Sequence, residues 1–181
     1  MKNKSTFITL FILIIVVLFV FFISQKSREK KVVQIKNIQD KVQLIDSEKG
    51  YQVKILNNEQ FLDQMTDGGG QLIGYLKDGK VVKIVEQLGL SYAVKTYRYY
   101  FSEDQLILVY EKDENFPYNE TTQALNYTKL ELAFEGRYFF EKEKLIDTQT
   151  TGTKRFSEGD NTNIEEFFLK IAKENIGLLT K

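Results

Sequence analysis

The sequence predicts an α+β fold: an antiparallel β-meander of about six strands, flanked by an N-terminal and a C-terminal helix and preceded by a transmembrane anchor. Three observations lead to this prediction. An apolar run with basic flanks opens the 181-residue chain. A strand-turn-strand pattern occurs twice in the middle of the chain, and segments with apolar residues at helical spacing stand on both sides of it. The chain therefore divides into a leader, residues 1–31, and a single α+β domain, residues 32–181.

The leader has the features of a membrane anchor. Two lysines precede an apolar run from Phe7 to Ile23, and four basic residues follow it, Lys26, Arg28, Lys30 and Lys31. The run is long for a signal peptide, whose core has roughly 7 to 15 residues, and lies at the lower limit for a span of roughly 17 to 25. Cleavage requires small residues, but the bulky Phe22 stands two positions before Ser24. We expect residues 7–23 to remain uncleaved and to anchor the protein in the membrane.

The orientation of this anchor has two interpretations. More basic residues follow the apolar run than precede it, which by the positive-inside rule would keep the domain in the cytoplasm. A short basic tip before an apolar core is also the form of an export signal, and folded domains are translocated despite flanking charge. We expect the domain to lie outside the cytoplasm. The chain has no cysteine, so attachment through a lipid-modified cysteine is excluded.

The composition of the domain excludes several classes of chemistry. The leader holds six basic residues and one acid, so residues 32–181 carry 19 basic against 24 acidic residues, a balance that disfavours nucleic acid as a partner. The chain has no histidine and no cysteine, which removes the commonest general base, thiol nucleophiles and zinc-thiolate sites. Carboxylate pairs such as Glu131 and Glu135 remain the only basis for a hydrolase. We expect no enzyme activity, no metal site and no cofactor.

The predicted elements follow in order along the domain. Residues 32–48 place Ile35, Ile38, Val42 and Ile45 at three- and four-residue spacing, which predicts an amphipathic helix that ends near Gly50 and covers one face of a sheet. Residues 51–56 alternate as a short strand. The glycine-rich residues 66–70 lack the Lys-Ser/Thr and the following helix of a phosphate loop, so we expect a plain turn. Residues 163–166 are typical of a helix start, and an apolar stripe follows to the end of the chain.

The repeat predicts the centre of the sheet. Residues 98–107 align without gaps on residues 137–146, and each copy is an aromatic strand, four polar residues and an aliphatic strand. This pattern predicts two β-hairpins, which pair residues 97–101 with 106–110 and residues 137–140 with 145–147. Residues 75–82 form a weaker third copy around an Asp-Gly turn signal. Between the two main hairpins, the mostly polar residues 112–127 are expected to form the longest loop.

Alternation along the strands assigns the side chains to two faces. One face is expected to hold Tyr99, Phe101, Leu106, Leu108, Tyr138 and Phe140. The other is expected to hold Arg98, Tyr100, Ile107, Val109, Arg137, Phe139 and Ile146. Because both faces are largely apolar, the sheet must be covered twice or must present one face to a partner.

The second face supplies the candidate binding surface. We expect Arg98, Tyr100, Arg137 and Phe139 to be partly exposed there, because Arg and Tyr are enriched where proteins meet partners. The alternative is that these four residues pack under a helix, with each arginine stem laid over an aromatic ring.

Several strings of the domain resemble a group of small exported bacterial proteins of unknown function, many of them lipoproteins or signal-peptide proteins. The strings are residues 66–70, 74–75, 81–84, 89–92, 99–101, 106–111 and 134–138. The resemblance spans roughly residues 35–179 and implies the same architecture, a location in the bacterial cell envelope and no known catalytic residues.

Together these observations predict a membrane-anchored, extracytoplasmic binding or interaction module that takes an envelope protein as its partner. Two alternatives stay open. One is an envelope hydrolase that uses carboxylates on the sheet face, and the other is a purely structural component of the envelope.

The anchor is testable by fractionation. If residues 7–23 span the membrane, the protein should stay with the membranes after washing with salt or alkali, and its mass should include residues 1–24. A soluble form that begins after Ser24 would contradict the anchor.

Overall fold

The structure, a computed structural model, describes residues 2–154 and 163–181, and their side chains from residue 25 onward. The chain forms two compact units, residues 1–37 and residues 38–181, and helix α1 (Lys2–Ser47) continues from the first into the second. The predicted anchor, residues 7–23, lies outside the part whose side chains are described. Within that part, no helix has the length and the apolar character that crossing a membrane requires.

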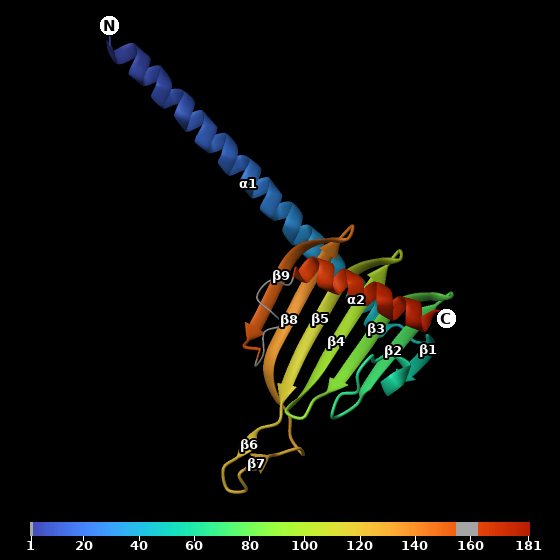
Figure 1. The fold of residues 1–181 in the computed structure, drawn as a ribbon. Coiled ribbons are helices and arrows are strands. Elements are labelled where there is room, and N and C mark those ends of the chain that lie inside the picture. Colours follow the sequence, from blue (N-terminus) through green and yellow to red (C-terminus); the bar gives the residue numbers. More distant parts are fainter. Residues whose placement is uncertain (1, 155–162) are drawn as a thin grey trace. The chain divides into compact units, whose positions relative to one another are not determined.

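The second unit is built on one antiparallel sheet of seven strands, in the order β1-β2-β3-β4-β5-β8-β9 (Figure 1). Their bounds are β1 (Gln52–Asn57), β2 (Gly70–Lys77), β3 (Lys80–Gly89), β4 (Ala93–Ser102), β5 (Gln105–Asn115), β8 (Glu131–Glu141) and β9 (Lys144–Gly152). The α+β class and the meander are therefore confirmed. The sheet has one strand more than the three predicted hairpins supply, because β1 adds to the edge of β2.

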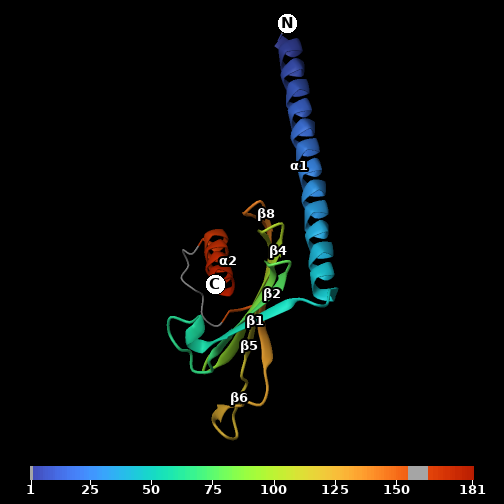
Figure 2. The ribbon, with the colours of Figure 1, turned by 90° about the vertical axis from the view of Figure 1, so that its right-hand side faces the viewer.

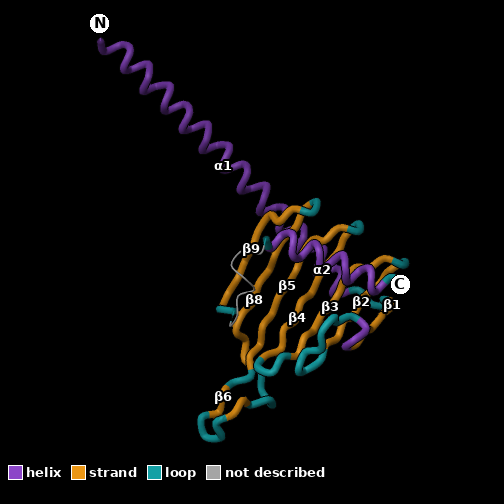
Figure 3. Tube along the Cα trace, viewed as in Figure 1, coloured by secondary structure: helices purple, strands orange, loops and turns teal. Residues whose placement is uncertain are grey.

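The two predicted hairpins are the pairs β4–β5 and β8–β9, and the third copy of the repeat is the pair β2–β3. At the tips of the two main hairpins the central residues have positive φ, near 55° and 62° at Glu103 and Asp104 and near 50° and 59° at Lys142 and Glu143. Two successive positive φ values define the tight turn whose twist matches that of the flanking strands. The connection from β5 to β8 contains a small hairpin of β6 (Tyr118–Asn119) and β7 (Ala124–Leu125), mostly loop in Figure 3.

A β-bulge in each main hairpin overturns part of the predicted assignment of faces. Tyr100 pairs with Leu108 and Phe101 pairs with Leu106, so Ile107 is an extra residue on β5. One inserted residue reverses the alternation of every side chain beyond it. Val109 therefore shares the face of Tyr99, and Leu108 shares the face of Tyr100, the reverse of the prediction. The pair β8–β9 repeats the irregularity, with Ile146 as its extra residue.

Helix α2 (Ile164–Leu179) covers one face of the sheet (Figures 1 and 2). Its cap is the predicted one, because the backbone N–H of Glu165 donates to the side chain of Asn163 at 3.2 Å. Phe168 packs against three tyrosine rings of the sheet, with centroid distances between 4.6 and 6.4 Å, to Tyr97, Tyr99 and Tyr138. Burying each such side chain contributes about 1.5–3 kcal/mol to the free energy of unfolding. These rings belong to the main hydrophobic core of the unit.

The start of α2 is also tied to the last strand. The carboxylate of Glu165 accepts hydrogen bonds from the backbone N–H of Leu145 at 2.7 Å and from the ammonium of Lys144 at 3.0 Å. These two donors hold the pKa of the Glu165 carboxyl below its usual value.

Residues 38–47 of α1 lie on the opposite face of the sheet (Figure 2). The predicted stripe is confirmed there, because Ile38 is buried and Val42 and Ile45 are half-buried. Asp46 fixes this segment to the sheet. Its carboxylate accepts a hydrogen bond from the hydroxyl of Tyr100 at 3.1 Å and forms an ion pair with Lys83 at 2.6 Å.

The face under α2 contains a fully buried carboxylate. Glu111 accepts hydrogen bonds from the hydroxyls of Tyr138 at 2.8 Å and Tyr97 at 3.4 Å, and it pairs with the ammonium of Lys154 at 2.5 Å. Gly136 lies opposite Glu111 in the register, and a Cβ there would come within 2.9 Å of the Tyr138 ring. The cluster links Lys154, two residues after the end of β9, to the middle of the sheet.

We expect Lys154→Met to lower the free energy of unfolding by about 3 kcal/mol, because it leaves the Glu111 charge buried without its cation. Urea unfolding of the full chain in detergent, followed by circular dichroism, measures the change. Lys144→Met is the matched control, since Lys144 pairs with Glu165 at the surface, and it should leave the midpoint unchanged. Equal losses from the two variants would contradict the role of the buried pair.

Candidate functional site

The strand register arranges the side chains of the face opposite α2 in rows that cross all seven strands. The covered row consists of Val53, Tyr75, Lys83, Tyr100, Leu108, Phe139 and Asp147. The mixed row consists of Ile55, Ile73, Val85, Arg98, Tyr110, Arg137 and Gln149. The polar row consists of Asn57, Gln71, Gln87, Thr96, Lys112, Glu135 and Thr151. We call the mixed and polar rows, together with Val53 at the edge, the open face.

Two of the four predicted surface residues belong to the covered row and lie in the interior. Tyr100 is 3% exposed and Phe139 is fully buried. Burial, and then the neighbouring Asp46 carboxylate, raises the pKa of the Tyr100 hydroxyl. The expected exposure of Tyr100 and Phe139 is thus wrong, because the helix lies over the hairpin end of the strands.

The other two predicted residues lie at the surface, in the mixed row. Arg98 and Arg137 stand on either side of Tyr110, with guanidinium carbons 5.1 and 5.7 Å from the centre of its ring. These distances are within the range of a cation-π interaction. Tyr110 was missed by sequence reasoning, since the face of every residue beyond the bulge in β5 depends on that bulge. The strand order is what identifies Tyr110 as part of the site, because it places β5 between β4 and β8.

The two arginines have different partners. The guanidinium of Arg137 forms an ion pair with Glu135 and is about half exposed. Arg98 is half-buried, and among the residues that the structure describes its side chain forms the contact with Tyr110 but no hydrogen bond or ion pair. The two arginines occupy aligned positions of the repeat. Among the described side chains of the fold, Arg137 has a carboxylate beside it and Arg98 does not.

The open face is apolar at its edge, where β1 lies. Val53 and Ile55 on the edge strand β1 are each 49% exposed, and Ile73 and Val85 on the next two strands are half-buried. Exposed apolar side chains that adjoin one another mark surfaces for interaction. The open face therefore passes from an aliphatic edge to an Arg-Tyr-Arg centre.

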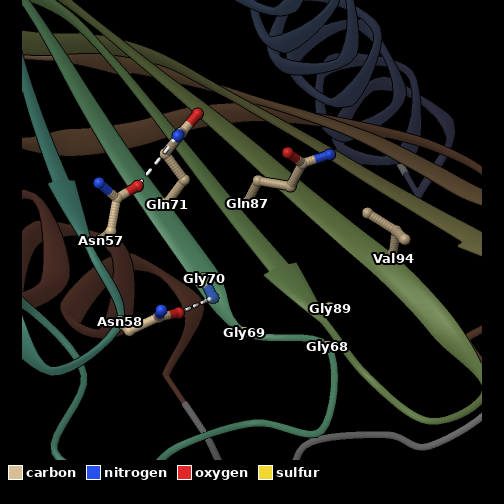
Figure 4. A pocket seen from close by; sticks show the side chains of 9 residues that line it. All are labelled: Asn57, Asn58, Gly68, Gly69, Gly70, Gln71, Gln87, Gly89 and Val94. Atoms are coloured by element: carbon tan, nitrogen blue, oxygen red, sulfur yellow. Dashed lines mark hydrogen bonds between the residues drawn. The ribbon is translucent and has the colours of Figure 1, made fainter.

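The polar row ends at β1 in a cavity of about 420 Å³ lined by carboxamides and glycines (Figure 4). The Gln71 amide donates to the side-chain oxygen of Asn57 at 3.0 Å, and the backbone N–H of Gly70 donates to the side-chain oxygen of Asn58 at 3.0 Å. The glycine-rich segment, predicted as a turn, closes this end of the sheet by backbone contact. A Cβ on Gly89 would lie 2.7 Å from the carbonyl oxygen of Gly68, so a side chain cannot be accommodated there.

The carboxylate pair considered for hydrolysis is engaged in surface ion pairs. Glu131 pairs with Lys129 at 2.5 Å, and Glu135 pairs with Arg137. Each carboxylate of the pair therefore has a neighbouring cation as its partner.

Comparison of the chain with family models, with curated proteins and with solved structures found no match. A functional hypothesis therefore rests on the leader sequence and on the geometry of the open face. That geometry can bind a partner through apolar contact and through charge.

Tyr100 should act as a structural residue. Tyr100→Phe removes the hydrogen bond to Asp46 and should lower the free energy of unfolding by about 1 kcal/mol at neutral pH. Because the pKa of Tyr100 is higher in the folded than in the unfolded chain, its contribution is present below a pH of about 10 and is lost as the pH rises further. The unfolding free energy of Tyr100→Phe, measured in denaturant between pH 8 and pH 11, should therefore fall less steeply than that of the unmodified chain. Parallel curves would contradict this role.

Proposed function

We propose that this protein is a membrane-anchored binding module of the bacterial cell envelope, that it has no enzymatic activity, and that its open face holds a protein partner. The observation that carries the proposal is the contrast between the two faces of the sheet. One face is packed under α2. Within the described part of residues 38–181, the other face is covered by residues 38–47, and only at its hairpin end. The rest of that face exposes aliphatic side chains beside two arginines.

The chemistry of this surface suits a protein partner. Aliphatic side chains that are half exposed in the free protein gain about 25 cal/mol for each Å² that a partner removes from water. Arginine and tyrosine add polar contacts, and both are enriched at the centres of interfaces. The proposed lack of enzymatic activity is supported by composition, because the chain has no histidine and no cysteine, the commonest general base and the thiol nucleophile.

The proposed location rests on the sequence. The apolar run at residues 7–23 with its basic flanks supports an anchor, and the resemblance to exported bacterial proteins supports an extracytoplasmic domain. An envelope protein is the corresponding class of partner.

An introduced cysteine tests location and binding in one experiment, because the chain has no native cysteine. Ile55→Cys places a thiol on the open face, and Lys173→Cys places one on the exposed side of α2. In intact cells, or in cells whose outer membrane alone is permeable, a membrane-impermeant maleimide should label the Lys173→Cys protein. A thiol-to-amine cross-linker should then join the Ile55→Cys protein to one discrete second protein.

The Lys173→Cys protein is the control for cross-linking. It should give no such adduct, since α2 lies on the other face. Labelling only after the inner membrane is broken would overturn the extracytoplasmic location. Adducts from both positions, or from neither, would overturn the open face as the binding surface.

A further inference from the structure

We infer that the open face selects a protein segment in which one carboxylate adjoins aliphatic side chains, and that Arg98 binds this carboxylate. The inference rests on the proposed binding function and names the chemistry of the partner.

Two of the three cations on the open face already have a carboxylate as their partner. Lys112 pairs with Glu114 at 2.7 Å, and Arg137 pairs with Glu135. Within the described part of the chain, Arg98 is the cation of the mixed and polar rows that has no carboxylate beside it. A partner that brings one carboxylate would complete this pattern.

The surroundings of Arg98 favour a bound counter-ion. Its cross-strand neighbours are Val85 on β3 and Tyr110 on β5, and the side chain is half-buried between these strands. A charge that is partly removed from water gains more from a counter-ion than one that is fully solvated. The guanidinium carbon of Arg98 lies 5.1 Å from the centre of the Tyr110 ring. A guanidinium has five N–H donors in a planar fork, and this fork matches the two oxygens of a carboxylate.

A strip of aliphatic side chains leads along the mixed row to Arg98. Ile55, Ile73 and Val85 precede it in the mixed row, one on each neighbouring strand. With strands about 4.8 Å apart, Ile55 lies about 14 Å from Arg98 along the row. At about 1.5 Å per residue, a helical segment of roughly nine residues spans this strip. The matching segment therefore carries aliphatic side chains over most of its length and an acid at one end.

Charge also decides between classes of anionic partner. Membrane surfaces and nucleic acids are polyanions, and binding them takes several cations together, typically about four to eight Lys or Arg for an anionic lipid surface. Among the described residues of the open face, Arg98 is the one cation without a carboxylate beside it. The carboxylates that pair with Lys112 and Arg137, which are Glu114 and Glu135, repel neighbouring phosphates. A single carboxylate on a protein segment is the anion that fits.

The test selects binding peptides without assuming their sequence. The full-length protein is held in lipid nanodiscs, a random-peptide phage library is selected on it, and peptides that Ile55→Lys no longer binds are kept as ligands of the open face. These peptides should carry Asp or Glu next to Leu, Ile or Val. In a synthetic copy, replacing the acid by its amide should weaken binding by about tenfold to a hundredfold, measured as Kd by fluorescence anisotropy.

A double-mutant cycle then identifies the partner of the acid. Arg98→Gln should weaken binding of the acidic peptide by the same factor and should leave the Kd of the amide peptide unchanged, because the interaction is already absent. Arg137→Gln is the matched control, since its guanidinium already has Glu135, and it should change Kd by less than about threefold. The amide substitution is made in the peptide, so it tests the need for the carboxylate whether or not Arg98→Gln folds normally.

Three outcomes separate this inference from the proposed function. Selected peptides without enriched acids, or an amide peptide that binds as tightly as its acid, overturn the inference and leave the binding module intact. A cycle in which Arg137→Gln accounts for the loss overturns the assignment to Arg98. A selection in which Ile55→Lys abolishes binding of no peptide overturns the open face itself.

Discussion

Both faces of this sheet carry apolar side chains that gain from being shielded from water, and the rest of the structure depends on how far each face is covered. The hairpin repeat places aromatic and aliphatic residues on either side of the same strands. Helix α2 covers one face along its length through Phe168. Residues 38–47 cover the hairpin end of the other face through Ile38 and Asp46. The unequal size of the two covers is the origin of the open face.

Polar groups are handled differently under the two covers. Beneath α2, the buried Glu111 is satisfied by two tyrosine hydroxyls and Lys154, so its charge is compensated inside the core. Lys154 thus ties the chain that follows β9 to the core, because an uncompensated carboxylate in the interior costs several kcal/mol. Beneath residues 38–47, Asp46 is shared between Tyr100 and Lys83 near the edge of the cover, where water still reaches it. The helix therefore ends in contact with the sheet, and the rows beyond it stay open.

The open face depends on the same pairing that forms the sheet. Arg98, Tyr110 and Arg137 come from three adjacent strands, and each lies in the mixed row because the ladders between those strands have one particular register. A shift of one residue would bury the arginines and expose the tyrosines of the core. Fold and proposed binding surface are thus set by one set of hydrogen bonds. The glycines at residues 68 and 89 support this end of the sheet by allowing two backbones to touch.

The sequence by itself determined the parts of the structure that depend on local pattern. The hairpins, the Asp-Gly turn, the stripe with Ile38, Val42 and Ile45, and the cap at Asn163 all follow from spacing and turn chemistry, because neighbouring residues suffice to select them. The α+β class followed from their order along the chain. Two of the four predicted surface residues, Arg98 and Arg137, were placed at the surface for the same reason.

Only the tertiary structure decided the rest. The bulge at Ile107 exchanged the faces of Leu108 and Val109, since a single unpaired residue leaves no mark on composition or periodicity. The extent of the helix cover decided that Tyr100 and Phe139 are interior. The strand order brought Tyr110 between two arginines that are 39 positions apart in the sequence, and it left one of them without a carboxylate. Aligned positions of a repeat carry the same residue type, but their surroundings come from strands elsewhere in the chain, and these surroundings determine what each side chain can bind.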